Sequence, residues 1–288
     1  MAPRDTSQRN LEHWSEAKRT EMQAFYTIAA EDYRPLAAAR DWGADLRLRA
    51  TDGHLRLLDV GCGSGRFPAA LLAAGLPAAV RDITVAVDLL DPAAFSIVET
   101  RAALAAPFKV AAEHEVALQN FDVRDRYDVA WAIHSLYALP LAELPDGVAR
   151  MVAALRSGGF GAVAHVSAES HYLRFYEAYR ATYSPNVAPF TEADEVAAAL
   201  AAAGADIRVQ LLHFRTGSAD RAVIESFLQR CAFDDSVSLA QMESDGPLAE
   251  YLRDCRTPDG SYHFEHEVHL MTWRAREKSA PADGHSSR

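Results

Sequence analysis

The residues whose types and spacing could hold a ligand begin with one aspartate and three glycines. Asp59 lies in a short apolar run, and Gly61, Gly63 and Gly65 follow it with the spacing Gly-x-Gly-x-Gly. Glycine permits a tight turn and lets a ligand approach the backbone where a Cβ would block it. A helix-like segment follows at once. The order strand, glycine turn, helix is typical of the cofactor-binding unit that opens a doubly wound α/β sheet.

A second pair of candidates follows a later strand. His134 and Tyr137 come at the end of a near-continuous apolar run over 127–133, which is typical of a central parallel strand. Ligands lie beyond the carboxyl ends of such strands, so both side chains are predicted to face the site. His134 could equally be a packed strand end. Because an unperturbed imidazole has a pKa of about 6.5, His134 is also a candidate proton acceptor near neutral pH.

Aromatic residues gather after the fifth predicted strand. Tyr172 and Tyr176 are four residues apart, so they share one face of a predicted helix. Such a face is by default core packing. At the mouth of a site it can instead hold a flat or cationic substrate, and both interpretations stay open.

The elements that must position these residues alternate along the chain. Residues 11–49 are helical in pattern, with a break at Pro35, and strands and helices alternate after them. This order predicts an α/β, Rossmann-like doubly wound sheet. We expect an N-terminal helical lid layer over 1–52, a main domain over 53–277 and a disordered tail over 278–288. The predicted strands cover 55–60, 84–87, 108–112, 127–133, 160–166, 207–214 and 262–273.

Composition narrows the class of partner. The 288 residues carry a net charge of −11, and an acidic surface repels phosphate backbones, so nucleic acid is not expected as a partner. Three cysteines without metal-ligand spacing fit a reducing compartment and predict no metal site. The first ten residues lack a signal-peptide pattern, and no apolar stretch is long enough to span a bilayer. We therefore expect a cytoplasmic monomer or dimer that has no membrane partner and acts on a small molecule.

The glycine turn and the preceding Asp59 resemble motif I of the class I S-adenosylmethionine (SAM) methyltransferases. Residues 155–159, Leu-Arg-Ser-Gly-Gly, are similar to another feature of that family. The resemblance implies a sheet with an antiparallel last strand, and SAM as a cofactor that is converted to S-adenosylhomocysteine without a metal. It also implies N-terminal helices that close over the site, although simple packing on the sheet is an equal alternative. The implied cofactor contacts are Asp59, Gly61, Gly63, Gly65 and Ile133.

The same resemblance implies an acidic residue after the second strand that accepts hydrogen bonds from two ribose hydroxyls. A carboxylate suits this role because it offers acceptors to two adjacent donors. Asp88 and Asp91 are both candidates. We favour Asp91, because Pro92 and a helix follow it as in the family. Asp91 would also fit a helix N-cap.

Several local features resemble the small-molecule amine methyltransferases typified by histamine N-methyltransferase. The segments 133–137 and 227–234 and the pair Asp91-Pro92 carry this likeness. By position, the resemblance implies five contacts with the substrate. Glu31 matches a glutamate of that group, and His134 stands where the group has glutamine. Tyr172 and Tyr176 stand where it has two tryptophans, and His266 stands where it has asparagine. The different identities argue against histamine itself as the substrate.

We therefore predict methyl transfer from SAM to a small molecule, with an amine or other nitrogen nucleophile, imidazole-like or aromatic, as the favoured acceptor. Glu31 and His134 are predicted to meet across the substrate as catalytic residues. An O- or C-methyltransferase of natural-product metabolism and a non-catalytic protein that binds SAM or a partner remain alternatives. So does a nicotinamide dehydrogenase, although Arg66 stands where its fingerprint has a third glycine. The predicted substrate-binding residues are Tyr137, Tyr172, Tyr176 and His266.

Overall fold

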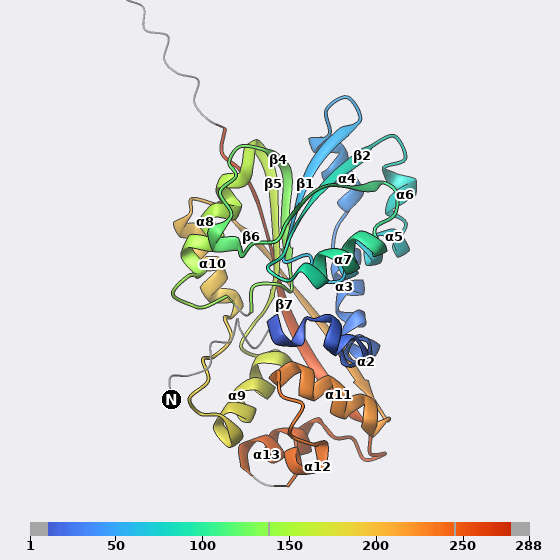
Figure 1. The fold of residues 1–288 in the computed structure, drawn as a ribbon, viewed down its shortest axis with the longest axis vertical. Coiled ribbons are helices and arrows are strands. Elements are labelled where there is room, and N and C mark those ends of the chain that lie inside the picture. Colours follow the sequence, from blue (N-terminus) through green and yellow to red (C-terminus); the bar gives the residue numbers. More distant parts are fainter. Residues whose placement is uncertain (1–10, 138, 245, 278–288) are drawn as a thin grey trace, which may run out of the picture.

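The computed structural model describes residues 11–137, 139–244 and 246–277, so the predicted tail over 278–288 lies outside the described residues. A seven-stranded sheet with the order β3-β2-β1-β4-β5-β7-β6 runs through the molecule, with helices on both faces (Figure 1). A second group of helices, α9, α11, α12 and α13, lies beyond one end of the sheet and is called the helical lobe here (Figure 1).

The direction of the strands matches the prediction. The first five strands pair in parallel, and β7 runs antiparallel to both β5 and β6. This arrangement confirms the Rossmann-like sheet with an antiparallel last strand. The strands are β1 (His54–Val60), β2 (Thr84–Leu90), β3 (Phe108–His114), β4 (Tyr127–Ile133), β5 (Leu155–Val166), β6 (Arg208–Ser218) and β7 (Tyr262–Arg274).

Two strands show why the sequence pattern located the strands well and the ends of the strands less well. All seven residues of β4 are buried, as expected for a central strand that is covered on both faces. Strand β2 ends at Leu90, three residues beyond its predicted end at Val87, because Asp88 is buried within the strand. There its carboxylate accepts a hydrogen bond of 2.7 Å from the hydroxyl of Tyr127. A satisfied buried carboxylate therefore does not end the strand.

Helices surround the sheet and build the helical lobe. The longer ones are α2 (Arg19–Ala29), α3 (Tyr33–Ala38), α4 (Trp42–Arg49), α5 (Arg66–Ala73), α7 (Ala94–Ala103), α8 (Leu144–Ala154), α9 (His171–Tyr183), α10 (Ala193–Ala202), α11 (Arg221–Ala232) and α13 (Gly246–Cys255). The shorter ones are α6 (Leu76–Ala79), α12 (Leu239–Met242) and the 3-10 turns η1 (Glu16–Lys18), η2 (Ala30–Asp32) and η3 (Leu118–Asn120).

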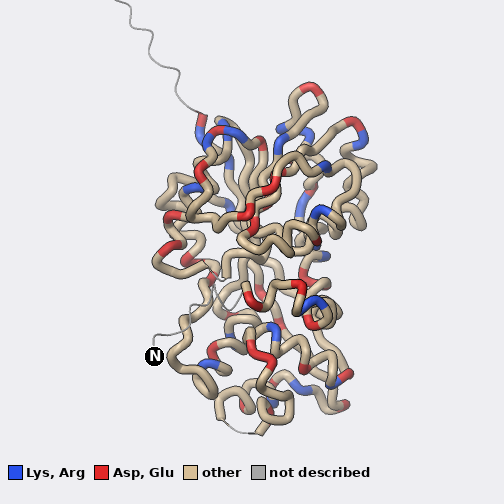
Figure 2. Tube along the Cα trace, viewed as in Figure 1, with Lys and Arg blue, Asp and Glu red and all other residues tan. Residues whose placement is uncertain are grey.

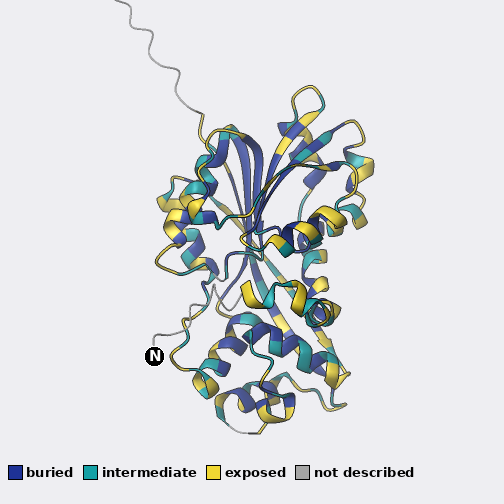
Figure 3. Cartoon of the chain, viewed as in Figure 1, coloured by how far each residue is buried: buried dark blue, intermediate teal, exposed yellow. Residues whose placement is uncertain are grey.

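Three groups of buried apolar side chains hold these layers together, and they appear as dark segments in Figure 3. The first lies between one face of the sheet and α3, α4 and α5. The second lies between the other face and α8, α10 and η3. The third joins α2 to the helical lobe and to the first residues of β7. The N-terminal helices thus pack on the lobe as well as on the sheet.

The predicted break in the N-terminal helical region lies slightly earlier than Pro35. Helix α2 ends at Ala29, the turn η2 follows, and α3 begins at Tyr33. Pro35 therefore lies in the first turn of α3, where the missing N–H has no helical partner to lose. The turn η2 carries Glu31 and Asp32 toward different surroundings, which becomes important at the site.

The distribution of charge and the length of the helices complete the description of the fold. In the view of Figure 2, basic and acidic residues are interspersed along the trace. Within the described ranges, none of the helices combines the length and the apolar composition needed to cross a membrane.

Candidate active site

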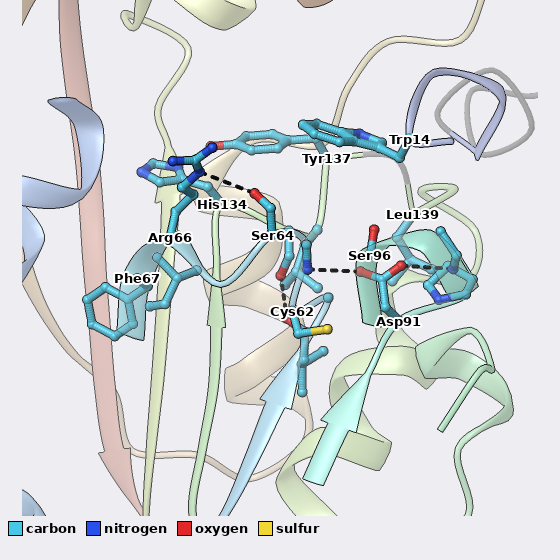
Figure 4. A pocket seen from close by; sticks show the side chains of 18 of the residues that line it. Trp14, Cys62, Ser64, Arg66, Phe67, Asp91, Ser96, His134, Tyr137 and Leu139 are labelled. Atoms are coloured by element: carbon cyan, nitrogen blue, oxygen red, sulfur yellow. Dashed lines mark hydrogen bonds between the residues drawn. The ribbon is translucent and has the colours of Figure 1, made fainter. Parts of the chain in front are cut away.

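A cavity of about 310 Å³ lies at the carboxyl ends of β1, β2 and β4. This is the edge of a doubly wound sheet at which ligands bind. The turn after β1 forms one side, and the loop over 116–119 and the segment over 133–137 form others. The N-terminal layer covers the cavity with Trp14, Phe25 and Tyr26. Figure 4 shows part of this lining, with Trp14 and Tyr137 among its labelled side chains.

The glycine turn has the backbone geometry that its sequence predicts. Gly61, Gly63 and Gly65 have φ angles of +60°, +55° and +69°, a region that other residues rarely adopt. A Cβ on Gly61 would lie 2.5 Å from the Cβ of Ser135, whereas a Cβ on Gly63 would meet only a carbonyl oxygen, at 3.9 Å. The backbone at Gly63 therefore faces open space in the cavity, as a ligand cradle requires.

Gly65 has a different task from its neighbours. It does not line the cavity, and a Cβ there would lie 3.2 Å from the Cβ of Ala103 and 3.3 Å from the Cα of Thr100. The absence of a side chain at Gly65 thus lets α5 approach α7 closely. The structure thus places Gly65 outside the cavity lining, although the sequence predicted a cofactor contact there.

Of the two candidate acids, Asp88 within β2 and Asp91 after it, only Asp91 lines the cavity. It follows the last residue of β2, and its carboxylate accepts hydrogen bonds from the backbone N–H of Gly63 at 3.1 Å and of Ala93 at 2.8 Å. Burial raises its pKa to about 6, and these two hydrogen bonds oppose the shift. The Ser96 hydroxyl is a third donor to this carboxylate, which keeps acceptor capacity toward the cavity. Helix α7 has Ala93 as its N-cap, so Asp91 does not occupy that position.

Asp59 lies under the turn with one oxygen unsatisfied. Its Oδ1 accepts a hydrogen bond of 2.8 Å from the indole N–H of Trp131. Among the residues that the structure describes, its buried Oδ2 has no hydrogen-bond partner. Burial raises the pKa of Asp59 to about 7. A buried oxygen without a partner beside an open cradle is the position where a ligand would supply a donor.

Comparison with known proteins agrees with this geometry. A family model described as a methyltransferase domain matches residues 58–160, which contain the glycine turn, Asp91 and β4. No curated protein matches the chain. Residues 58–160 therefore match a methyltransferase domain, and the surrounding sheet has the fold of such a domain.

Solved structures share the fold of this chain at low sequence identity. A candidate methyltransferase from Bacillus halodurans is 16% identical, with 82% of this chain and 99% of that chain covered and a TM-score of 0.54. The YcgJ protein from Bacillus subtilis is 12% identical, with 82% and 98% covered and a TM-score of 0.54. A candidate histamine N-methyltransferase from Thermotoga maritima is 14% identical, with 92% and 100% covered and a TM-score of 0.51. At such identities the likeness concerns the fold alone.

The part of the cavity away from Asp91 is lined by aromatic side chains and one carboxylate. We call it the aromatic chamber and define it by Asp32, Tyr33, His134, Tyr137, Tyr172, Phe190 and Phe233. Asp32 is 3% exposed, and its Oδ2 accepts a hydrogen bond of 2.5 Å from the hydroxyl of Tyr172. Its Oδ1 has no partner within the described part of the chain. Burial raises the pKa of Asp32 to about 7.

His134 lies in the chamber in a rarely adopted conformation. Its φ angle is +53°, and left-handed backbone at a residue other than glycine is common at functional sites. Its Nδ1 lies 2.6 Å from the hydroxyl oxygen of Tyr137, and its Nε2 has no partner among the described residues. Burial, with His165 and His266 nearby, lowers the pKa of His134 to about 3. The ring is therefore neutral at physiological pH, unlike the histidine with an ordinary pKa that the sequence suggested.

The structure does not bring Glu31 and His134 together. Glu31 does not line the cavity; its side chain is 54% exposed and pairs with Arg34 at 3.0 Å. The neighbouring Asp32 lines the chamber instead. Adjacent residues in a 3-10 turn point in directions about 120° apart, so the carboxylate of Asp32 reaches the cavity when that of Glu31 reaches solvent.

Tyr176 and His266 also lie outside the cavity lining, whereas Ile133, Tyr137 and Tyr172 are part of it. The buried ring of Tyr176 stacks at 3.7 Å on Phe190, which separates it from the chamber. His266 is 2% exposed, and its Nε2 lies 2.8 Å from the hydroxyl oxygen of Thr216. Its ring lies 5.1 Å from that of Tyr172. Both residues support chamber residues from behind.

Sequence reasoning missed several residues that line the cavity. Asp32, Tyr33 and Tyr26 come from the N-terminal layer, where no motif marks them. Arg66 lies directly after the glycine turn, and its position in the fingerprint could have drawn attention to it. Across the described ranges, no set of three His, Cys, Asp or Glu side chains is placed to hold a metal ion.

Proposed function

We propose that this protein transfers the methyl group of SAM to a nitrogen atom of a small, positively charged molecule. The observation that carries the proposal is the buried carboxylate of Asp32, which lies among aromatic rings with one oxygen unsatisfied. Aromatic faces attract cations, and a buried carboxylate gains most from a charged donor. A protonated amine or imidazole supplies both a cation and an N–H donor.

The other half of the cavity fits SAM. The open backbone at Gly63 would accommodate a ligand without a steric clash, and the carboxylate of Asp91 would accept hydrogen bonds from the ribose hydroxyls. The unsatisfied oxygen of Asp59 would accept a donor from the amino acid part. When bound, SAM supplies an electrophilic methyl group on its sulfonium and leaves as S-adenosylhomocysteine. Ile133 and Gly61 would line the same space.

Asp32 would hold the cationic acceptor, and it is matched to the proton transfer that methylation of an amine requires. A protonated amine has no lone pair, so it must lose a proton before it can attack a methyl group. A carboxylate whose pKa burial raises to about 7 accepts that proton more readily than an ordinary aspartate does. The Tyr172 hydroxyl keeps its hydrogen bond to Oδ2 and fixes the direction of the carboxylate.

His134 would contribute as a neutral hydrogen-bonding group and stays the second candidate for the proton acceptor. Its free Nε2 can accept an N–H from the substrate. Because its pKa is about 3, it is the weaker base of the two. We therefore assign the base to Asp32 and the orientation of the acceptor to His134 and Tyr137.

The N-terminal layer over 1–52 would act as a lid, as part of the domain division that we propose. Within its described residues, Trp14, Phe25 and Tyr26 cover the cavity, and α2 packs on the helical lobe in the third core. A covered chamber excludes bulk water, which strengthens the electrostatic contacts inside it.

Screening purified protein with isotopically labelled SAM tests the proposal. The panel pairs amines and imidazoles with phenols of similar size. Label in amine products from the wild type, with kcat/KM reduced at least about tenfold in Asp32→Asn, is the expected result. Glu31→Gln is the matched control, because it removes a neighbouring carboxylate that faces solvent. Transfer to phenols alone, or equal kcat/KM in Asp32→Asn and the wild type, would overturn the nitrogen assignment.

A further inference from the structure

Two arginines, Arg66 and Arg230, line the cavity with a charge opposite to that of Asp32, and Arg66 lies beside the glycine turn. Arg66 is the first residue of α5 and follows the glycine turn. Within the described part of the chain, its guanidinium contacts a hydroxyl and an aromatic ring rather than a carboxylate. Its Nε donates a hydrogen bond of 3.3 Å to Ser64 Oγ, and its Cζ lies 4.1 Å from the centre of the Tyr26 ring.

These two contacts orient the guanidinium and leave most of its donors available. Five N–H bonds radiate from an arginine side chain, and the contact with Ser64 uses one of them. Figure 4 shows Arg66 extending from the glycine turn toward His134 and Tyr137. Arg66 is only partly buried, so its remaining donors can be reached from the cavity. A preorganised fork of this kind matches a carboxylate in a bidentate arrangement.

The local electrostatics favour an anion at this point. Helix α5 spans eight residues, has no acidic residue in its first turn, and has Gly65 as N-cap without a side chain. Its first N–H groups and the helix dipole therefore add positive potential beside Arg66. In β1, just before the turn, the unsatisfied Oδ2 of Asp59 is an acceptor for a cation. The end of β1 and the turn thus present one site for a positive group and one for a negative group.

We propose that Arg66 binds the α-carboxylate of the amino acid part of SAM, while Asp59 receives its ammonium group. The proposal rests on the proposed function, since it concerns the same cofactor. The carboxylate is the only anionic group of SAM, and the ammonium and sulfonium are both cations. A guanidinium that lines the cofactor space would repel SAM unless it pairs with that carboxylate.

Tyr26 is the positioning residue for this contact. It belongs to α2, is 8% exposed and lines the cavity, and its ring lies 5.9 Å from that of Trp14. Because the ring holds the guanidinium plane, binding of the carboxylate by Arg66 would also favour the closed position of α2. Tyr26→Phe keeps this stacking, and Tyr26→Leu removes it.

Calorimetric titration with three cofactor analogues tests the assignment. S-adenosylhomocysteine has both the carboxylate and the amino group, decarboxylated SAM lacks the carboxylate, and methylthioadenosine lacks the whole amino acid part. Arg66→Met should weaken S-adenosylhomocysteine about tenfold or more, the effect of losing a charged hydrogen bond. Its affinity for the other two ligands should stay within about threefold of the wild type, or increase for decarboxylated SAM because a repulsion is removed.

Three further variants make the result decisive. Arg34→Met removes the same charge from an exposed site of the N-terminal layer and should change none of the affinities. Arg66→Lys keeps the charge without the fork, so it should bind S-adenosylhomocysteine with an intermediate affinity, and it replaces Arg66→Met if that variant does not fold. Tyr26→Leu should weaken S-adenosylhomocysteine more than Tyr26→Phe does.

Two outcomes would overturn the proposal and can be told apart. If the wild type binds none of the three ligands, the proposed function fails together with this inference. If the wild type binds S-adenosylhomocysteine and Arg66→Met binds it equally well, only the assignment of Arg66 fails. An increase in the substrate KM of Arg66→Met, with unchanged cofactor affinity, would move the carboxylate from the cofactor to the substrate and would likewise overturn the proposal.

Discussion

The carboxylate of Asp32 accepts a hydrogen bond of 2.5 Å from the hydroxyl of Tyr172, although the two residues lie 140 positions apart in the chain. Asp32 ends the turn between α2 and α3, and Tyr172 lies in the first turn of α9. This contact closes the aromatic chamber between the N-terminal layer and the segment that follows β5. Both the charge and the shape of the chamber therefore depend on a folded N-terminal layer.

The first prediction concerns the pH dependence of catalysis. Burial raises the pKa of Asp32 to about 7, so the carboxylate is ionised above pH 7 and protonated below it. Because the ionised form is the one that would hold a cation and accept its proton, kcat/KM should fall about tenfold per pH unit below that point. His134, with a pKa of about 3, should not contribute to this limb. A profile measured for the wild type, Asp32→Asn and His134→Ala checks this, and a limb that disappears in His134→Ala alone would contradict it.

The same aspartate should reduce stability at high pH. Its pKa is raised to about 7 in the folded protein, whereas an unfolded aspartate titrates near about 3.9. The penalty for ionising the buried group is therefore absent below about pH 4, grows as pH rises through the interval, and is complete above about pH 7. Asp32→Asn should raise the melting temperature at pH 8 and change it little at pH 4. Thermal unfolding at both pH values tests the sign, and an equal shift at the two would show that ionisation is not the cause.

Substitutions of the two candidate ribose acids, Asp88 and Asp91, should have different effects. Asp91→Ala should weaken S-adenosylhomocysteine by about 1.5–3 kcal/mol, because charged hydrogen bonds to the ribose are lost. Asp88→Ala should instead lower the melting temperature, since it leaves the hydroxyl of Tyr127 and the nearby Arg126 without their buried partner. Calorimetry with thermal unfolding distinguishes the two effects. The assignment of Asp91 is wrong if only Asp88→Ala weakens binding.

Gly63→Asp should abolish cofactor binding while the protein stays folded. The new side chain would occupy the open space beside the turn and place a negative charge next to Asp91. The matched control is Gly75→Asp, because Gly75 also has a positive φ, of +91°, and has no atom within 4 Å of its Cβ position. Both variants carry backbone strain, and only the first should lose S-adenosylhomocysteine in calorimetry. If Gly63→Asp still bound S-adenosylhomocysteine, the proposal that the cofactor lies against the backbone of Gly63 would be wrong.

The two tyrosines that share one helical face should respond differently. Tyr172→Phe removes the donor to Asp32 from the chamber and should raise the substrate KM several-fold with unchanged cofactor affinity. Tyr176→Ala opens a cavity behind Phe190 and should lower stability by about 3–5 kcal/mol, the cost of truncating a large buried ring. Steady-state kinetics and denaturant unfolding test the pair. If Tyr176→Ala changed KM and left stability intact, Tyr176 would belong to the chamber after all.

The sheet and the part of the cavity around the glycine turn were predictable because local sequence determines them. A glycine turn after an apolar strand encodes its own geometry, and a buried central strand such as β4 is apolar along its whole length. The choice between Asp88 and Asp91 was harder, because it depends on Tyr127, which satisfies Asp88 from the second strand along in the sheet. No local pattern contains that partner.

The aromatic chamber was less predictable because it is assembled from distant segments. Glu31 and Asp32 are adjacent residues that both carry a carboxylate, and only the orientation of the turn η2 decides which of them reaches the chamber. The lowered pKa of His134 likewise depends on burial and on His165 and His266, which lie on other strands. The sequence predicts which types of residue form the chamber, but only the tertiary structure shows what surrounds each of them.

Strand β7 sets the way in which ligands can enter and leave. Its thirteen residues pass through all three cores, with Phe264 in that of the helical lobe, Leu270 in one sheet core and Trp273 in the other. It pairs continuously with β6, from Tyr262 opposite Ser218 to Thr272 opposite Arg208. A hinge between the sheet and the helical lobe would break this ladder, so the two parts form one rigid frame. The N-terminal helices contribute no strand to it, and the rates of ligand exchange should therefore depend on how fast these helices lift away.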